Sequence, residues 1–220
     1  MLIVLDGLDS SGKKTQSDLL IKRLKSKGVK TGFFDFPRYE SFYGKLIARY
    51  LKGEFGDVYD VSPYLASLLY ALDRQGAGDL LIKWLKEGRI IILNRYVSSN
   101  KAFQAAKLKD KEKRQFYDWL EELEYKKNLL PKEDILFYLD VPIEISQKWL
   151  STKGYRKYMG NAEKDIHEKN TDYLRKVEKL YLELVEKHEN YHRIACVKDN
   201  RALNPEEINE KIWTYLDKVI

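Results

Sequence analysis

The chain begins with Leu2-Ile-Val-Leu-Asp-Gly7-Leu-Asp-Ser-Ser-Gly12-Lys13, and this stretch decides its fold. The apolar run at its start has the length of a buried strand, and the pattern after Lys13 is that of a helix. Gly7 and Gly12 lie five apart with Lys13 directly after them, which matches G-x-x-x-x-G-K. In this motif backbone N–H groups surround phosphate oxygens, and the helix N-terminus faces the same anion. The order strand, glycine loop, helix therefore predicts a nucleotide-phosphate site, with a ligand-free glycine turn as the alternative.

The candidate phosphate-binding residues lie in this loop and at the start of the helix. They are Gly7, Ser10, Ser11, Gly12, Lys13, Lys14 and Thr15. One position departs from the common pattern, because Lys14 stands where a Ser or Thr hydroxyl usually binds Mg²⁺. Thr15 comes one place too late for that contact.

Length and composition predict an ordinary globular protein. With 220 residues the chain is long enough for one large core and short for two, so we expect a single domain over residues 1–220. No apolar run approaches the roughly 20 residues that cross a bilayer. The start of the chain lacks the cationic leader of a secretory signal. The single cysteine, Cys196, excludes an internal disulfide and fits a reducing compartment, so we expect a cytoplasmic protein without a membrane partner.

The net charge of +6 suggests phosphate-bearing ligands. Many lysines alternate with acidic residues, as at 109–113, which is typical of solvated helix faces and not of a nucleic-acid surface. We therefore expect small nucleotides as ligands and no nucleic acid, while a basic nucleic-acid-binding protein remains a third alternative.

Strand and helix patterns alternate along the chain. Further apolar runs predict strands at 29–34, 90–93, 135–139 and 193–197. Helical spacing predicts helices after Lys13, over 42–51, from Pro63, again after Gly78, over 97–106, around 116–123, after Pro142, around 174–185 and from Pro205. The last helix should turn Ile208, Ile212, Leu216 and Val219 inward. This alternation predicts a three-layer α/β domain with a parallel sheet. At 151–162 the pattern lapses into a basic stretch flanked by glycines, which suggests a mobile lid.

Four motifs follow the phosphate loop in order. They are Phe36-Pro-Arg-Tyr39, Tyr70…Arg74, Asn94-Arg-Tyr-Val-Ser-Ser-Asn100 and Tyr138-Leu-Asp-Val-Pro142. With these motifs the chain resembles the thymidylate kinases from Leu2 to about Leu216. The resemblance implies a P-loop NTPase fold with a five-stranded parallel sheet. It also implies Mg²⁺-dependent transfer of the γ-phosphoryl group of ATP to dTMP, giving dTDP, usually in a homodimer.

The resemblance assigns catalytic roles to four residues. Lys13 would hold the β- and γ-phosphates of ATP, and Arg95 would clamp the acceptor phosphate with its planar fork. Asp9 would lie beside the acceptor phosphate, the sugar and the metal. Because Ser10 and Ser11 leave no arginine in the loop, Arg156 or Lys153 of the lid would close over the transferred group. The plainer alternatives are a salt-bridged strand-end arginine, a turn aspartate and an ordinary basic loop.

The resemblance also assigns the acceptor site. Phe36 and Tyr70 would enclose the thymine ring, while Arg74 and Asn100 would address its polar edge and favour a 4-oxo pyrimidine. Phe103, often tyrosine in the family, would lie near the sugar. His167 would lie over the nucleotide, with a helix-surface histidine as the alternative. Further contacts to the phosphate or the base would be made by Arg38, Tyr39, Ser99 and Gln104.

Two positions depart from the family pattern, since most members carry aspartate at Asn94 and Ser or Thr at Lys14. Our hypothesis is that Lys14 partly replaces the charge of the metal and that Mg²⁺ is bound mainly by Asp9 and the phosphates. The departures also leave open a protein that binds nucleotides without catalysis. A kinase of the same fold for another nucleotide is a further alternative.

Overall fold

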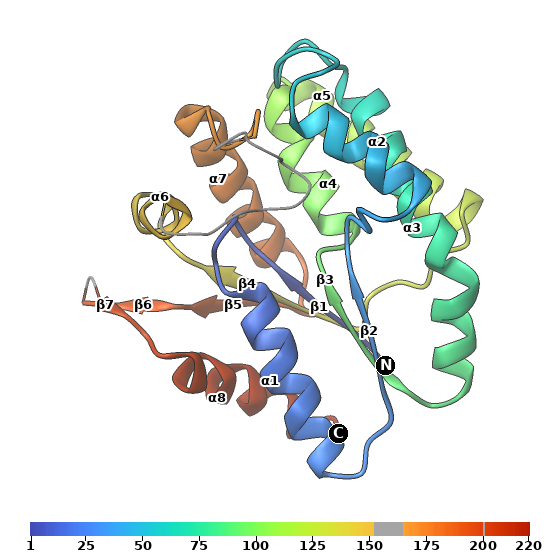
Figure 1. Cartoon of the computed structure of the whole chain (residues 1–220), viewed down its shortest axis with the longest axis vertical. Helices are drawn as coiled ribbons and strands as arrows, with labels where there is room; N and C mark the ends of the chain where they lie inside the picture. Colours follow the sequence, from blue (N-terminus) through green and yellow to red (C-terminus); the bar gives the residue numbers. More distant parts are fainter. Residues whose placement is uncertain (152–164, 200) are drawn as a thin grey trace.

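A parallel five-stranded sheet forms the centre of the molecule in the computed structural model, which describes residues 1–151, 165–199 and 201–220 (Figure 1). The strands are β1 (Leu2–Asp6), β2 (Thr31–Asp35), β3 (Ile90–Asn94), β4 (Ile135–Asp140) and β5 (Tyr191–Ala195). Their order is β2-β3-β1-β4-β5, with every neighbouring pair parallel. The predicted three-layer P-loop fold is confirmed.

Helices cover both faces of this sheet. The helices are α1 (Lys13–Ser26), α2 (Phe42–Leu51), α3 (Pro63–Lys86), α4 (Val97–Phe103), α5 (Asp110–Glu121), α6 (Ile143–Ser151), α7 (Thr171–Lys187) and α8 (Pro205–Leu216). α1 and α8 pack on one face, while α3, α4 and α7 pack on the other (Figure 1). Short elements complete the described chain: the 3₁₀ turn Ala105–Lys107, the π-helix Glu122–Lys127, and the hairpin of β6 (Val197–Lys198) and β7 (Arg201–Ala202).

Side chains of the central strands alternate between two cores. In β1, Leu2 and Val4 join the core under α3 and α7, whereas Ile3 and Leu5 join the core under α1 and α8. All five residues of β1 and all five of β3 are buried, as expected for parallel strands covered on both faces. The carboxyl ends of the strands therefore carry the polar residues, and the site forms there.

Some local predictions are wrong. Helix α3 runs without a break through Gly76 and Gly78, so the separate helix predicted after Gly78 does not exist. A Cβ at Gly76 would lie 2.6 Å from Nη2 of Arg38, so this glycine serves close packing and not chain reversal. Val219, predicted to face inward, lies beyond the end of α8 and is 58% exposed.

Two segments need separate mention. The predicted lid at 151–162, with Lys153 and Arg156, lies outside the described residues except for Ser151 at the end of α6. In the part of the chain that the structure describes, no helix combines the length and apolarity needed to span a bilayer.

Candidate active site

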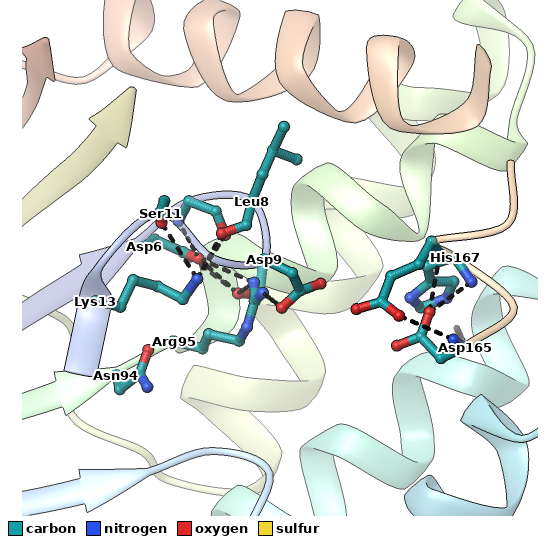
Figure 2. Close-up of polar contacts among 12 residues, drawn as sticks. Asp6, Leu8, Asp9, Ser11, Lys13, Asn94, Arg95, Asp165 and His167 are labelled. Carbon is teal, nitrogen blue, oxygen red and sulfur yellow. Dashed lines mark hydrogen bonds and ion pairs between the residues drawn. The ribbon is translucent and has the colours of Figure 1, made fainter. Parts of the chain in front are cut away.

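The loop between β1 and α1 has the backbone that the motif predicts. Gly7 and Gly12 adopt φ values of 148° and 89°, and a Cβ at Gly7 would lie 2.8 Å from the carbonyl oxygen of Leu139. The buried Nζ of Lys13 donates to the carbonyl oxygens of Gly7 at 3.1 Å and Leu8 at 2.7 Å (Figure 2). The ammonium group is thus held inside the loop, where phosphate oxygens would meet it.

The two residues after Lys13 face solvent. Lys14 Nζ lies 2.5 Å from the Asp18 carboxylate, one turn along α1, and 5.4 Å from the centre of the Phe33 ring. Thr15 is exposed as well. The structure therefore places Lys14 on the outer edge of the loop, within reach of the end of β2.

Asp6, the last residue of β1, is a buried carboxylate that the sequence analysis did not identify. Asp6 accepts hydrogen bonds from Ser98 at 2.6 Å, Ser99 at 2.8 Å and the Tyr181 hydroxyl at 2.7 Å. Its carboxylate also lies 3.5 Å from Nη1 of Arg95. Asp6 thereby joins β1, α4 and α7 behind the arginine.

Arg95 stands between the loop and a pocket. It follows β3 with a φ of 66°, and its Nη2 donates to Asp9 at 2.8 Å (Figure 2). Its guanidinium also lies 5.1 Å from the centre of the Phe103 ring. Burial alone would lower the pKa of Arg95, but the carboxylates of Asp9 and Asp6 outweigh burial and raise it. The group is therefore a permanent cation at the junction.

The pocket collects nearly all predicted acceptor residues. Its lining consists of Asp9, Phe36, Pro37, Tyr39, Leu51, Tyr70, Arg74, Arg95, Ser99, Asn100, Phe103, Gln104, Asp165 and His167. Arg38 is missing from this lining, because its guanidinium donates to the Asp73 carboxylate and to carbonyl oxygens of α3. Asp73 lies about three turns into α3 and is buried, and sequence reasoning did not identify it as the partner of Arg38.

Arg74 lines the pocket and is held by buried acceptors. Only 2% of its surface is exposed, and its guanidinium donates to the fully buried Glu124 of the π-helix and to the carbonyl oxygen of Tyr96. Burial would lower the pKa of Arg74, but the charge of Glu124 more than compensates and raises it. Asn100 donates to the carbonyl oxygen of Ser67 at 3.3 Å, which fixes its amide. Glu124 was not predicted.

His167 also lines the pocket. It sits in a turn, only 4% exposed, so the alternative of a helix-surface histidine is wrong. Burial lowers the pKa of His167 to about 3, so the ring is neutral near pH 7. Its Nε2 lies 3.3 Å from the Tyr50 hydroxyl, and its ring packs against Phe103 at 5.3 Å.

Three carboxylates converge beside His167. Ligand atoms of Asp9, Asp165 and Glu168 all lie within 4.8 Å of one another. The turn is preorganised, because Asp165 accepts hydrogen bonds from the backbone N–H groups of His167 and Glu168, both at 2.9 Å. Oxygen ligands of this kind suit Mg²⁺. Of this cluster the sequence indicated only Asp9.

Asn94 has an acidic neighbour on the adjacent strand. Its Nδ2 donates to Oδ1 of Asp35 at 2.7 Å, and the two residues are register partners at the ends of β2 and β3. Arg156, the remaining predicted catalytic residue, lies outside the described residues.

Comparison with known proteins agrees with this geometry. Residues 5–208 match the family model described as thymidylate kinase. The thymidylate kinase of Mycobacterium tuberculosis is 30% identical over 185 residues, which cover 84% of this chain and 85% of that protein. A probable thymidylate kinase of Methanocaldococcus jannaschii is 32% identical over 219 residues, covering 100% and 97%.

The solved structures give the same answer. The structure of thymidylate kinase from Candida albicans matches with a TM-score of 0.76 and 25% sequence identity, covering 99% of this chain and 91% of that one. With a phosphate loop, a neighbouring pocket and a family match over almost its whole length, this chain belongs to the thymidylate kinase family, the nucleoside monophosphate kinases that phosphorylate dTMP.

Proposed function

We propose that the pocket binds dTMP, that the phosphate loop binds ATP, and that residues 1–220 act as one kinase domain. The observation that carries this division of the site is the position of Arg95. Its guanidinium lines the pocket and also pairs with Asp9 of the loop at 2.8 Å. A cation at this junction can neutralise the acceptor phosphate where it meets the γ-phosphate.

The reaction needs positioning and charge neutralisation more than covalent help from the protein. ATP is the donor in this family. Lys13 would hold its β- and γ-phosphates, and the N–H groups of residues 7–15 would surround them. An oxygen of the dTMP phosphate attacks the γ-phosphorus, the bond to the β–γ bridging oxygen breaks, and ADP leaves. Arg95 would keep the attacking phosphate in line.

Base selectivity would come from Arg74 and Asn100. Glu124 takes Nε and one N–H of Nη2 of Arg74, which leaves N–H groups of the guanidinium turned to the pocket for an exocyclic oxygen. A 4-amino pyrimidine would place a donor against this donor, and an unmatched buried donor is costly. Phe36 and Tyr70 would provide apolar contact to the ring. Phe103 and His167 would enclose the sugar.

We propose Mg²⁺ as the cofactor. One oxygen each of Asp9, Asp165 and Glu168 lies within 4.8 Å of the others, and these carboxylates would hold the ion on the acceptor side, directly or through its waters. When bound, the ion would neutralise phosphate charge as the two nucleotides approach. Asp9 also accepts from Arg95, so ion and guanidinium would share one carboxylate.

We also propose a homodimer. Helices α2 and α3 pack on each other and expose apolar side chains, among them Phe42 at 72% and Leu65 at 60%. Such side chains on one helix pair fit a self-association surface. Light scattering after size-exclusion chromatography would test this, because Leu65→Glu should convert a dimer into a monomer, whereas Glu186→Gln, at an exposed position of α7, should not. A cytoplasmic location completes the proposal and is supported by the single free cysteine, Cys196.

A coupled assay for ADP formation tests the proposed function. The acceptors are dTMP, dUMP, UMP, dCMP and dGMP with Mg²⁺-ATP. We expect turnover led by dTMP, and loss of at least about a hundredfold in kcat with Arg95→Lys, because lysine cannot grip two phosphate oxygens at once. Arg175→Lys, an exposed arginine of α7, is the control. A different leading acceptor, or ATP binding without turnover, would contradict the assignment.

A further inference from the structure

β2 and β3 end side by side with a carboxylate and an amide in contact. Asp35 closes β2, Asn94 closes β3, and the two are partners in the parallel register. The amide nitrogen of Asn94 donates to Oδ1 of Asp35 at 2.7 Å. This bond orients the amide, so its oxygen necessarily points away from Asp35.

Both side chains project from the sheet face that carries α1. Two residues earlier on each strand, Phe33 and Ile92 pack in the core under α1. Since side chains alternate along a strand, Asp35 and Asn94 leave the sheet on that same face, toward the beginning of α1. Lys14 reaches the same region, with Nζ 5.4 Å from the ring of Phe33. The pair therefore lies on the ATP side of the site.

Among the described residues, no cation contacts the oxygens of this pair directly. Asn94 is only 8% exposed, and its Oδ1 is buried without a hydrogen-bond partner among the described residues. Asp35 is accessible to solvent and makes no ion pair within 4 Å in the described ranges. Partial burial raises the pKa of Asp35 even though the charges of Arg95, Lys13 and Lys14 act against it. The buried, unpaired Oδ1 of Asn94 therefore points to a missing hydrogen-bond donor.

A triphosphate alone would be a poor partner for this pair. Phosphate oxygens, the free carboxylate oxygen of Asp35 and Oδ1 of Asn94 are all hydrogen-bond acceptors, and two of these groups are negatively charged. A hydrated divalent cation solves the conflict, because its waters donate to oxygen on every side and its charge offsets both anions. In P-loop enzymes the metal next to the phosphates commonly relies on a strand-end aspartate.

We infer that Asp35 and Asn94 together orient the water shell of the Mg²⁺ that accompanies ATP, with the carboxylate supplied by β2 and the amide by β3. The inference rests on the proposed use of Mg²⁺. It makes Asp35 a positioning residue on the donor side, distinct from the Asp9 cluster: Figure 2 shows Asn94 and Asp165 on opposite sides of Arg95. It also explains Asn94, because a carboxylate at both strand ends would place two charges in contact.

The test compares Asp35→Asn with the exchanged pair Asp35→Asn/Asn94→Asp. Mn²⁺ binding is measured by electron paramagnetic resonance without dTMP, both with and without a non-hydrolysable ATP analogue, and the Mn²⁺ site that appears only with the analogue is compared. Asp35→Asn should weaken Mn²⁺ binding at least about tenfold, as expected for loss of an outer-sphere carboxylate. The affinity of Asp35→Asn for the metal-free ATP analogue should equal or exceed that of the wild type. The exchanged pair carries the same two groups on opposite strands and should recover most of the Mn²⁺ affinity.

Asp79→Asn, an exposed carboxylate of α3, controls for net charge and should bind Mn²⁺ like the wild type. Equal Mn²⁺ affinity in Asp35→Asn and the wild type would overturn the inference while leaving the proposed function intact. An exchanged pair as weak as Asp35→Asn would overturn it too, because the carboxylate would then not be transferable between the strands. If the wild-type complex binds no Mn²⁺, the cofactor proposal fails first and the inference falls with it.

Discussion

Removing the charge of Glu124 should strongly destabilise the protein. Arg74 and Glu124 are 2% and 0% exposed, and no other acid forms an ion pair with Arg74 in the described ranges. Among the described residues, Glu124→Leu would leave the buried guanidinium with only the carbonyl oxygen of Tyr96 as an acceptor. Breaking a buried pair from one side costs roughly 3 to 5 kcal/mol. For a chain of this size, that corresponds to a fall in Tm of roughly 6 to 20 °C.

Urea unfolding and thermal denaturation measure this loss, with Glu122→Leu as the matched control. Glu122 lies two residues earlier in the same π-helix, but it is 55% exposed and 3.5 Å from Lys127. An exposed pair contributes only about 0 to 1 kcal/mol, so the control should barely change the unfolding free energy. Equal effects of the two substitutions would refute the reasoning.

A double variant separates the structural role of this pair from its role in binding. Arg74→Met/Glu124→Leu removes both charges, and apolar replacement of a whole buried pair is often neutral or stabilising. The double variant should therefore recover much of the stability lost in Glu124→Leu. It should still show a raised KM for dTMP, because Met offers no donor to the base. If KM stayed unchanged in a stable double variant, Arg74 would not recognise the base.

Other buried groups give three further predictions. Asp6→Asn should reduce kcat with dTMP at least about tenfold, because an amide nitrogen cannot accept the hydrogen bond from the Ser99 hydroxyl or pair with Arg95. Steady-state kinetics would detect this loss, and an unchanged kcat would contradict the prediction. Burial lowers the pKa of Lys107 to about 7, so the unfolded chain binds more protons than the folded protein above that pH. Relative to Lys107→Met, the wild type should gain stability in urea unfolding from pH 7 to pH 9, by at most about 1.4 kcal/mol per pH unit; a constant difference would contradict this. Burial also lowers the pKa of His167 to about 3, so its neutral form supports folding fully above pH 6.5 and progressively less as pH falls toward 3. His167→Phe should therefore lose less stability than the wild type between pH 6.5 and pH 4, and equal losses in urea unfolding would argue against a buried neutral ring.

Local sequence was sufficient for the parts of the protein that depend on near neighbours. Apolar runs predicted all five strands of the central sheet, and they are clearest in β1, β3 and β4, which are buried on both faces. The phosphate loop could be predicted because Gly7, Gly12 and Lys13 form one short loop that is continuous in sequence. The acceptor residues came from the family resemblance, and the pocket gathers them with the exception of Arg38.

Tertiary structure alone decided which charges meet. Glu124 lies 50 residues from Arg74, and Asp6 binds Tyr181 across 175 residues, so no local pattern marks either carboxylate as a partner. Asn94 and Asp35 are separated by 59 residues and adjoin only because β2 pairs with β3. The spacing of apolar residues predicts which face of a helix or strand is buried, because burial depends on each side chain separately. An ion pair or a shared metal is a property of two, and its energy depends on the distance and burial that only the folded chain sets.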